Sequence, residues 1–295
     1  MLWLSRLCPV VVVAAMMTAC GGEAPPAPAP TPKAAPPPAP AKATEPEVAL
    51  HDRGRVFLVG GEVGFVPLAC SDKGGAKPER FKTGDACLEL LPKGAQVRGE
   101  DGTARTVTGT AKDPCEGATA VTVEGSGDAW RGHATAPPVD AEWVEVVPPT
   151  TPAEDDAAAP AELRARVVAQ VEKDHPGVKA KKLQVRQRAL LDLDGDDAPE
   201  QVLAVAVPGA KDADGDETLA FAGLYVVAPG DAPPRKLAGS APGTVQYRVL
   251  GVLDLDKDGK VELWLNTYDA DKFTQSLASV GEAGLEQFGH WVCEA

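Results

Sequence analysis

The sequence contains few aromatic residues, few histidines and none of the common enzyme motifs. Only 5% of its 295 residues are Phe, Trp or Tyr, and only four are His. It lacks GxSxG, HExxH, a P-loop GKS or GKT, and GxGxxG after a strand, which are the usual signs of acyl transfer, zinc hydrolysis and nucleotide binding. His51 and His133 have no acidic or cysteine neighbour at metal-ligand spacing, so we expect both on the surface. The sequence therefore predicts a protein that is not an enzyme, with glycosidase chemistry by paired carboxylates as the alternative.

Positive charge is also scarce. The chain has 29 Lys and Arg against 43 Asp and Glu, a formal net charge of −14, and its isoelectric point is near 4.8. Binding to nucleic-acid phosphates requires a basic face, and so does electrostatic attraction to anionic lipids. We therefore expect no nucleic-acid partner and no polybasic membrane contact.

The first twenty residues are typical of an export signal. Arg6 precedes an apolar run from Leu7 to Met17, which is too short to span a bilayer. The next residues, Met17-Thr18-Ala19-Cys20, resemble the bacterial lipobox, with Met17 in place of the usual Leu. This resemblance implies a signal peptide at 1–19 and a lipid anchor, with palmitate or similar acyl chains on Cys20. Several acyl chains give stable anchoring.

The same resemblance indicates where the protein resides. It implies the bacterial cell envelope, and because position +2, counted with Cys20 as +1, is Gly21 and not Asp, the family's sorting rule implies the outer membrane. Ordinary secretion, with Cys20 a plain thiol, is the alternative.

Two proline-rich segments divide the chain. Residues 24–46 contain ten Pro and eight Ala. Such a composition cannot bury enough apolar surface to fold, so 20–46 is predicted to be a disordered linker that samples polyproline II. A second proline-rich and acidic stretch at 148–160 is predicted to be an interdomain linker. The expected fold is mainly β, with two small β-rich domains at 47–147 and 161–295.

Short apolar runs separated by turn residues predict a small barrel or sandwich in the first domain. The expected strands are Arg55–Val59, Leu88–Leu91, Ala95–Arg98, Ala104–Gly109, Ala120–Glu124 and Glu142–Val147. The closing EWVEVV resembles the last strand of bacterial Src-homology-3-like domains, which implies a cell-wall-glycan-binding role. A structural β-domain is the alternative. Trp130 and Trp143 are either a ligand platform or packing residues.

Four cysteines remain after signal removal and acylation of Cys20. They are Cys70, Cys87, Cys115 and Cys293, an even number that favours disulfides in an oxidising compartment. Full pairing joins Cys293 to one of the other three and so connects the two segments. One disulfide in the first segment with a free Cys293 is the alternative. The chain has no CxxC, so neither a thioredoxin-like site nor a zinc knuckle is supported.

The second segment is predicted to begin with a helix at Ala161–Asp174. Leu163, Val167, Val168 and Val171 share one stripe of this helix, and His175-Pro176-Gly177 ends it. An internal repeat follows, in which ALLDLDGDDAPE at 189–200 returns as GVLDLDKDGKVE at 251–262, an offset of 62 residues. Extended runs precede and follow each copy, so the acidic loops are expected to join strands. Two closing strands are expected at 272–280 and 284–292, with Trp264 and Trp291 in the core.

The repeat places oxygen ligands at positions 1, 3, 5, 7 and 9 of two loops. Alternate residues of a tight turn point towards one centre, and Ca²⁺ takes six to eight oxygens at about 2.3–2.6 Å with tolerant geometry. Mg²⁺ demands stricter geometry and fits less well. In loop 1 (residues 192–200) the predicted ligands are Asp192, Asp194, Asp196, the carbonyl of Ala198, and Glu200. In loop 2 (residues 254–262) they are Asp254, Asp256, Asp258, the carbonyl of Lys260, and Glu262.

The loops resemble the calcium-binding DxDGDGxxD loops of FG-GAP/VCBS repeats in exported and surface proteins. Asp197 and Lys257 depart from the glycines of that pattern, and two copies are too few for a propeller. An EF-hand would need helices and a Glu at position 12, where this chain has Leu203 and Leu265. Metal-free acidic turns are the alternative for both loops. A third acidic run at 212–217 has Ala220 at position 9, and we expect a hairpin loop there.

Overall fold

Strands make up most of the structure, which confirms the mainly β fold class. The computed structural model describes residues 54–71, 80–125, 132–136, 143–149, 159–211, 217–230, 232–269 and 272–294. The predicted signal peptide, Cys20, the linker at 20–46, His51, Trp130 and most of both 148–160 and the third acidic run lie outside these residues. Within the described part of the chain, no helix combines the length and the apolar character needed to cross a membrane.

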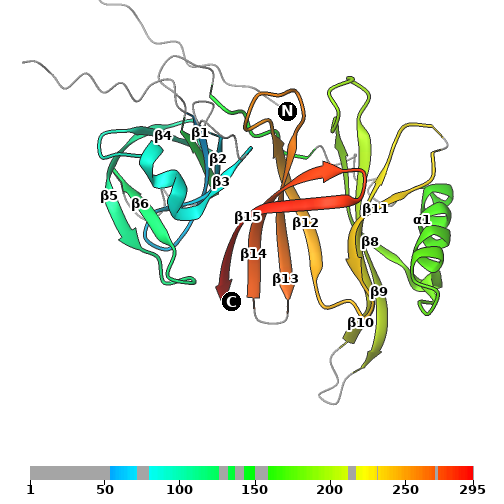
Figure 1. The fold of residues 1–295 in the computed structure, drawn as a ribbon. Coiled ribbons are helices and arrows are strands. Elements are labelled where there is room, and N and C mark those ends of the chain that lie inside the picture. Colours follow the sequence, from blue (N-terminus) through cyan, green and yellow to red (C-terminus); the bar gives the residue numbers. More distant parts are fainter. Residues whose placement is uncertain are drawn as a thin grey trace, which may run out of the picture. The chain divides into compact units, whose positions relative to one another are not determined.

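A closed barrel forms the first part of the described chain (Figure 1). Six antiparallel strands follow one another in the order β1-β7-β4-β5-β6-β2, and pairing of β2 with β1 closes the ring. The two-residue strand β3 (Lys82–Thr83) pairs with the outer end of β2. The six barrel strands are β1 (Arg55–Gly60), β2 (Phe65–Ser71), β4 (Gln96–Gly99), β5 (Ala104–Lys112), β6 (Thr119–Val123) and β7 (His133–Ala136). The contact between β6 and β2 is a single residue pair, Val121 with Phe65, so the ring is held there by fewer backbone hydrogen bonds than elsewhere.

Strand β1 is buried on both of its faces. Val56 and Leu58 point into the barrel core, whereas Phe57 and Val59 belong to a second core that contains Trp264 and Trp291. Alternate residues of a strand point to opposite faces, so a strand covered on both sides is apolar throughout. The apolar run in RVFLV is therefore uninterrupted because the barrel packs against the C-terminal part of the chain.

Two strands predicted for this region are wrong. Leu88–Leu91 falls mostly in a 3₁₀-helix, Gly84–Leu90, which carries the buried Cys87 into a disulfide with Cys70. In the described part of Glu142–Val147, residues 143–147, the structure has one isolated bridge, from Val147 to Val252, and no barrel strand. The described part of the segment with the Src-homology-3-like pattern thus forms a bridge to β12 (Gln246–Leu253) of the repeat, and β7, with the small and polar sequence HATA, takes its place in the ring.

The repeat folds into two four-stranded antiparallel meanders of the same topology. Their strand orders are β11-β10-β9-β8 and β12-β13-β14-β15. The first meander consists of β8 (Gln184–Leu191), β9 (Glu200–Lys211), β10 (Glu217–Val227) and β11 (Arg235–Ser240). The second consists of β12 (Gln246–Leu253), β13 (Glu262–Asp269), β14 (Lys272–Gly281) and β15 (Gly284–Glu294). Each acidic loop joins the first two strands of its meander, as the sequence predicted, and two meanders do not make a propeller.

Each meander is covered on both faces. One core lies between the two meanders and contains Leu191 and Val202 of the first with Val252 and Leu263 of the second. Helix α1 (Ala161–Asp174) covers the other face of the first meander through Leu163, Val167 and Val171, as the predicted stripe required. The barrel covers the other face of the second meander. The described residues, all of which follow Val48, accordingly form one compact unit, and the domain boundary at 148–160 stays a prediction.

A glutamine side chain joins the edge strands of the two meanders. Gln187 of β8 donates through Nε2 to the carbonyl of Val249, and its Oε1 accepts from the backbone N–H of Val249, both at 2.8 Å. The two residues occupy equivalent positions, 62 residues apart, and each lies at a register shift of its strand. The amide therefore satisfies backbone groups on the outer edge of β12 that no strand of its own sheet pairs.

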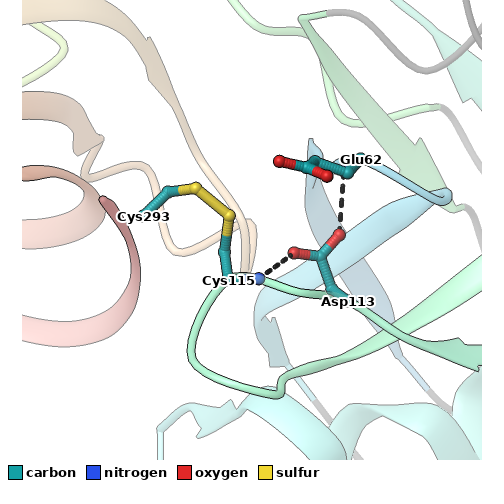
Figure 2. Close-up of a disulfide and its surroundings, with 4 residues drawn as sticks. All are labelled: Glu62, Asp113, Cys115 and Cys293. Atoms are coloured by element: carbon teal, nitrogen blue, oxygen red, sulfur yellow. Dashed lines mark hydrogen bonds between the residues drawn. A yellow bond between two sulfur atoms is a disulfide. The ribbon is translucent and has the colours of Figure 1, made fainter. Parts of the chain in front are cut away.

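The described cysteines form two disulfides, Cys70–Cys87 within the barrel and Cys115–Cys293 between the barrel and β15. Of the two arrangements open from the sequence, the structure has the one that connects both segments. Figure 2 shows the Asp113 carboxylate beside this link, where it accepts from the backbone N–H groups of Cys115 at 3.0 Å and Glu62 at 2.8 Å. Asp113 is 1% exposed, and these bonds give its buried carboxylate the partners it requires.

Candidate metal centres

The two acidic loops share one backbone conformation. Positions 4 and 6 have positive φ in both, with Gly195 at 79° and Asp197 at 65° in loop 1, and Lys257 at 57° and Gly259 at 84° in loop 2. Left-handed conformations are costly for residues with a Cβ, so Asp197 and Lys257 are held there by the rest of the loop. Asp197 and Lys257, which replace glycines of the family pattern, therefore change the side chains of the two loops but not their backbone conformation.

In loop 1 the carboxylates at positions 1 and 9 accept hydrogen bonds from the backbone of the loop. Asp192 accepts from Gly195 at 2.8 Å and from Asp197 at 3.1 Å, and Glu200 accepts from Leu193 at 2.9 Å. Oxygens of Asp192, Asp194 and Glu200 all lie within 4.8 Å of one another. Glu200 is 8% exposed, so this carboxylate forms the floor of the group.

Loop 2 repeats this arrangement. Asp254 accepts from Asp258 at 3.1 Å and from Gly259 at 3.0 Å, and Glu262 accepts from Leu255 at 2.9 Å. Oxygens of Asp254, Asp256 and Glu262 lie within 4.8 Å of one another, and Glu262 is fully buried. Positions 1, 3 and 9 thus meet in both copies.

The structure does not add position 5 to either group. Asp196 accepts from the backbone N–H of Ala198 at 2.8 Å, and Asp258 accepts from that of Lys260 at 2.9 Å. One oxygen of each carboxylate is therefore engaged with its own loop, and neither residue belongs to the set of mutually close oxygens. The ligand roles predicted for Asp196, Asp258 and the carbonyls of Ala198 and Lys260 stay predictions.

Both groups fit a hard cation. Ligands on opposite sides of a calcium ion at about 2.3–2.6 Å are at most about 5 Å apart, which matches the 4.8 Å limit of each group. In loop 2, Oδ1 of Asp256 is buried and has no hydrogen-bond partner among the described residues. A buried acceptor without a partner is costly, and a cation would satisfy it. Each loop can thus hold one metal ion, and the donor set of three carboxylates is typical of Ca²⁺ or Mg²⁺.

Burial perturbs the electrostatics of loop 2. Desolvation raises the pKa of Glu262 to about 7, while its hydrogen bond from Leu255 and the nearby charge of Arg80 act in the opposite direction. An adjacent positive charge favours the ionised form of a buried carboxyl group. Glu262 is therefore harder to ionise than an exposed glutamate, and a positive charge beside it favours its anionic form.

Arg80, a residue that the sequence did not single out, supplies such a charge. Its Nε lies 2.8 Å from Oδ2 of Asp256, and its Nη2 lies 3.0 Å from both Oδ2 of Asp258 and Oε1 of Glu262. The hydrogen bond to Asp256 is the main cause that raises the pKa of this guanidinium. Arg80 precedes β3 and is 176 residues from Asp256, so no local pattern connects the two.

A second candidate site is a cleft of about 420 Å³ at the barrel. It is lined by Arg98 of β4, by Glu100 directly after this strand, by His133 of β7, and by Trp143. The guanidinium carbon of Arg98 lies 5.6 Å from the centre of the Trp143 ring, an arrangement typical of cation–π contact. Trp143 thus lies at a ligand-sized cleft, and this position is compatible with the predicted role as a ligand platform.

The prediction that His133 lies on the surface is wrong. Its side chain is 15% exposed and packs against Phe57 and Trp264, with ring centres 6.0 and 5.2 Å away. Burial lowers the pKa of His133, and the charge of Glu100 partly opposes this shift. No local pattern predicts this burial, since both aromatic partners are distant along the chain.

Comparison with known proteins gives no relative. No family model, no curated protein sequence and no solved structure matches the chain. The functional argument therefore depends on the chemistry of the sites.

Proposed function

We propose that this protein is a lipid-anchored bacterial envelope protein whose C-terminal repeat is stabilised by calcium and acts as a binding or structural module without enzymatic activity. The observation that carries the proposal is the same three-carboxylate group at the same place in two equivalent meanders. The lipobox-like Met17–Cys20 and the proline-rich stretch after it support the anchor and a spacer between membrane and folded part. The resemblance to FG-GAP/VCBS loops favours calcium over other hard cations.

The physical basis is mutual repulsion within each loop. Loop 1 has five carboxylates in nine residues, and folding brings oxygens of three of them within 4.8 Å. Like charges this close destabilise the folded loop unless a counter-ion neutralises them. A site that exists only in the folded state converts cation binding into folding stability.

The test is thermal unfolding of the full chain in chelator and in calcium. Calcium at about 100 times its dissociation constant should stabilise the folded protein by about 2.7 kcal/mol per site, which raises Tm by about 5–10 °C. Asp194→Asn and Asp256→Asn should each reduce that shift, and Glu282→Gln, at an exposed position in the turn between β14 and β15, is the matched control. Equal shifts in all four proteins would reject the ligand assignment, and elemental analysis of the purified protein identifies the metal.

The anchor is tested separately. Bacteria that express the chain and are fed a labelled palmitate analogue should incorporate the label, and Cys20→Ala should abolish incorporation. Membrane fractionation then locates the labelled protein in the outer or the inner membrane. Export of an unlabelled wild-type protein would show ordinary secretion and reject the anchor.

The alternative proposal is that the protein binds cell-wall glycan through the barrel. The cleft next to Trp143 favours it, because aromatic rings with polar neighbours suit sugar faces and hydroxyl groups. Retention of the full chain on purified peptidoglycan, lost in Trp143→Ala and kept in Glu282→Gln, would support this function. The full chain is needed, because the barrel shares a core with the second meander.

A further inference from the structure

Loop 2 already contains a cationic group from another part of the chain. We propose that Arg80 is a built-in cation of loop 2, which competes with a divalent ion for the carboxylates of Asp256 and Glu262. The inference rests on the proposed function, because it assumes that the loops bind divalent cations. It adds that the two loops are not equivalent and that the barrel regulates the second one.

Arg80 uses the oxygens that the loop backbone leaves free. In Glu262, Oε2 accepts from Leu255 and Oε1 faces Arg80, and in Asp258, Oδ1 accepts from Lys260 and Oδ2 faces Arg80. An incoming ion would approach these same free oxygens. A guanidinium and a divalent cation cannot both occupy the few ångströms between them, so binding of one must displace the other.

The position of Arg80 is fixed by its neighbour and not only by the acidic loop. Phe81 stacks on Phe288 of β15, with ring centres 4.2 Å apart and an interplanar angle of 11°. The guanidinium carbon of Arg80 lies 4.9 Å from the centre of the Phe81 ring. This stacking contact holds the Arg80 backbone next to loop 2, which gives the guanidinium a high local concentration there.

The formal charges of the two loops also predict weaker calcium binding at loop 2 than at loop 1. Loop 1 has five carboxylates and no lysine, a formal charge of −5. Loop 2 has four carboxylates and two lysines, a formal charge of −2, which Arg80 brings to −1. Because calcium affinity rises with the charge of the ligand set, loop 1 should fill first and loop 2 only when Arg80 is displaced.

The experiment is a calcium titration of the full chain by calorimetry, for the wild type, Arg80→Gln and the control Arg248→Gln, an exposed arginine of β12. We expect Arg80→Gln to bind its second calcium at least about tenfold more tightly than the wild type, because in the wild type the ion must first displace the guanidinium of Arg80 from loop 2. Adding Asp256→Asn to Arg80→Gln should remove that gain. Without calcium, Arg80→Gln should have a Tm lower by about 5 °C, which calcium restores.

Two results would overturn the inference. One is a titration of Arg80→Gln identical to that of the wild type and of Arg248→Gln. The other is a loss of stability that calcium does not restore, which would make Arg80 a structural counter-ion only. Should Arg80→Gln fail to fold, Arg80→Lys, which keeps the charge but loses the planar fork, should bind the second calcium more tightly than the wild type, and wild-type affinity would reject the competition.

The failure of this inference is distinguishable from that of the proposed function. A first site that Asp194→Asn abolishes, with no change in Arg80→Gln, retains the proposed function and rejects the inference. A site that appears only in Arg80→Gln and depends on Asp256 retains the inference and rejects loop 1 as a calcium site. Absence of calcium binding in both proteins rejects both.

Discussion

Removal of the Cys115–Cys293 disulfide should destabilise this protein more than removal of Cys70–Cys87. A disulfide restricts the unfolded chain, and the loss of entropy grows with the length of the loop that it closes. The two bridges span 178 and 17 residues, which correspond to about 5 and about 3 kcal/mol at 25 °C. For a protein of this size these values lower Tm by about 10–20 °C and about 6–12 °C.

Urea unfolding of Cys115→Ala/Cys293→Ala and Cys70→Ala/Cys87→Ala measures both effects in one buffer, with mass spectrometry to verify the remaining bridge. Packing acts in the opposite order, because Cys70 and Cys87 are fully buried, whereas Cys115 is 6% exposed and Cys293 is half-buried. Cavities cost more at fully buried positions. A larger loss in Cys70→Ala/Cys87→Ala would therefore show that packing dominates and would refute the chain-entropy reasoning.

Two further predictions concern the junctions between sheets. Gln187→Met should lower the free energy of unfolding by about 1–3 kcal/mol, because it leaves the N–H and carbonyl of Val249 unpaired. The control Gln184→Met, at an exposed position of the same strand, should change this free energy little, and equal urea midpoints for the two variants would contradict the role of the amide. Burial lowers the pKa of His133, so the unfolded chain takes up a proton there first, and the unfolding free energy should fall as pH drops below about 6.5. His133→Phe should flatten this part of the pH profile measured by urea unfolding, whereas His290→Phe, at an exposed position, should not; unchanged slopes in both would reject the assignment.

The parts of the fold that sequence alone predicted are those with a local cause. The bounds of α1 and the two strand-loop-strand units follow from helical periodicity and from the 62-residue repeat, and both match the structure. The 3₁₀-helix at Gly84–Leu90 was missed because the Cys70–Cys87 disulfide, a contact between separate parts of the chain, overrides the strand propensity of the local sequence. Strand β2 was missed because Pro67 interrupts its pattern, and the structure places that proline at a register shift opposite Leu58.

The residues of the candidate site likewise fall into those that local sequence predicts and one that it does not. Spacing along the chain brought positions 1, 3 and 9 together in each loop, since a tight turn of nine residues closes on itself. Arg80 reaches loop 2 only because the barrel packs on the second meander, and the sequence separation of 176 residues hides that contact. Local sequence therefore identified the carboxylates that meet in each loop but not the guanidinium that contacts them in loop 2.

The covering of the meanders shows how two repeats bury their apolar faces without forming a ring. In a propeller each sheet is covered by its neighbours, whereas two sheets alone leave two apolar outer faces exposed. Helix α1 covers one of them, and the outer face of β1 and β2 covers the other through Phe57 and Leu68. Since that face of the barrel is buried, it is closed to any partner of the folded protein, and the barrel can present only its remaining surface, which includes the cleft at Trp143. The segment that leads into β3 of the barrel also brings the guanidinium of Arg80 to loop 2.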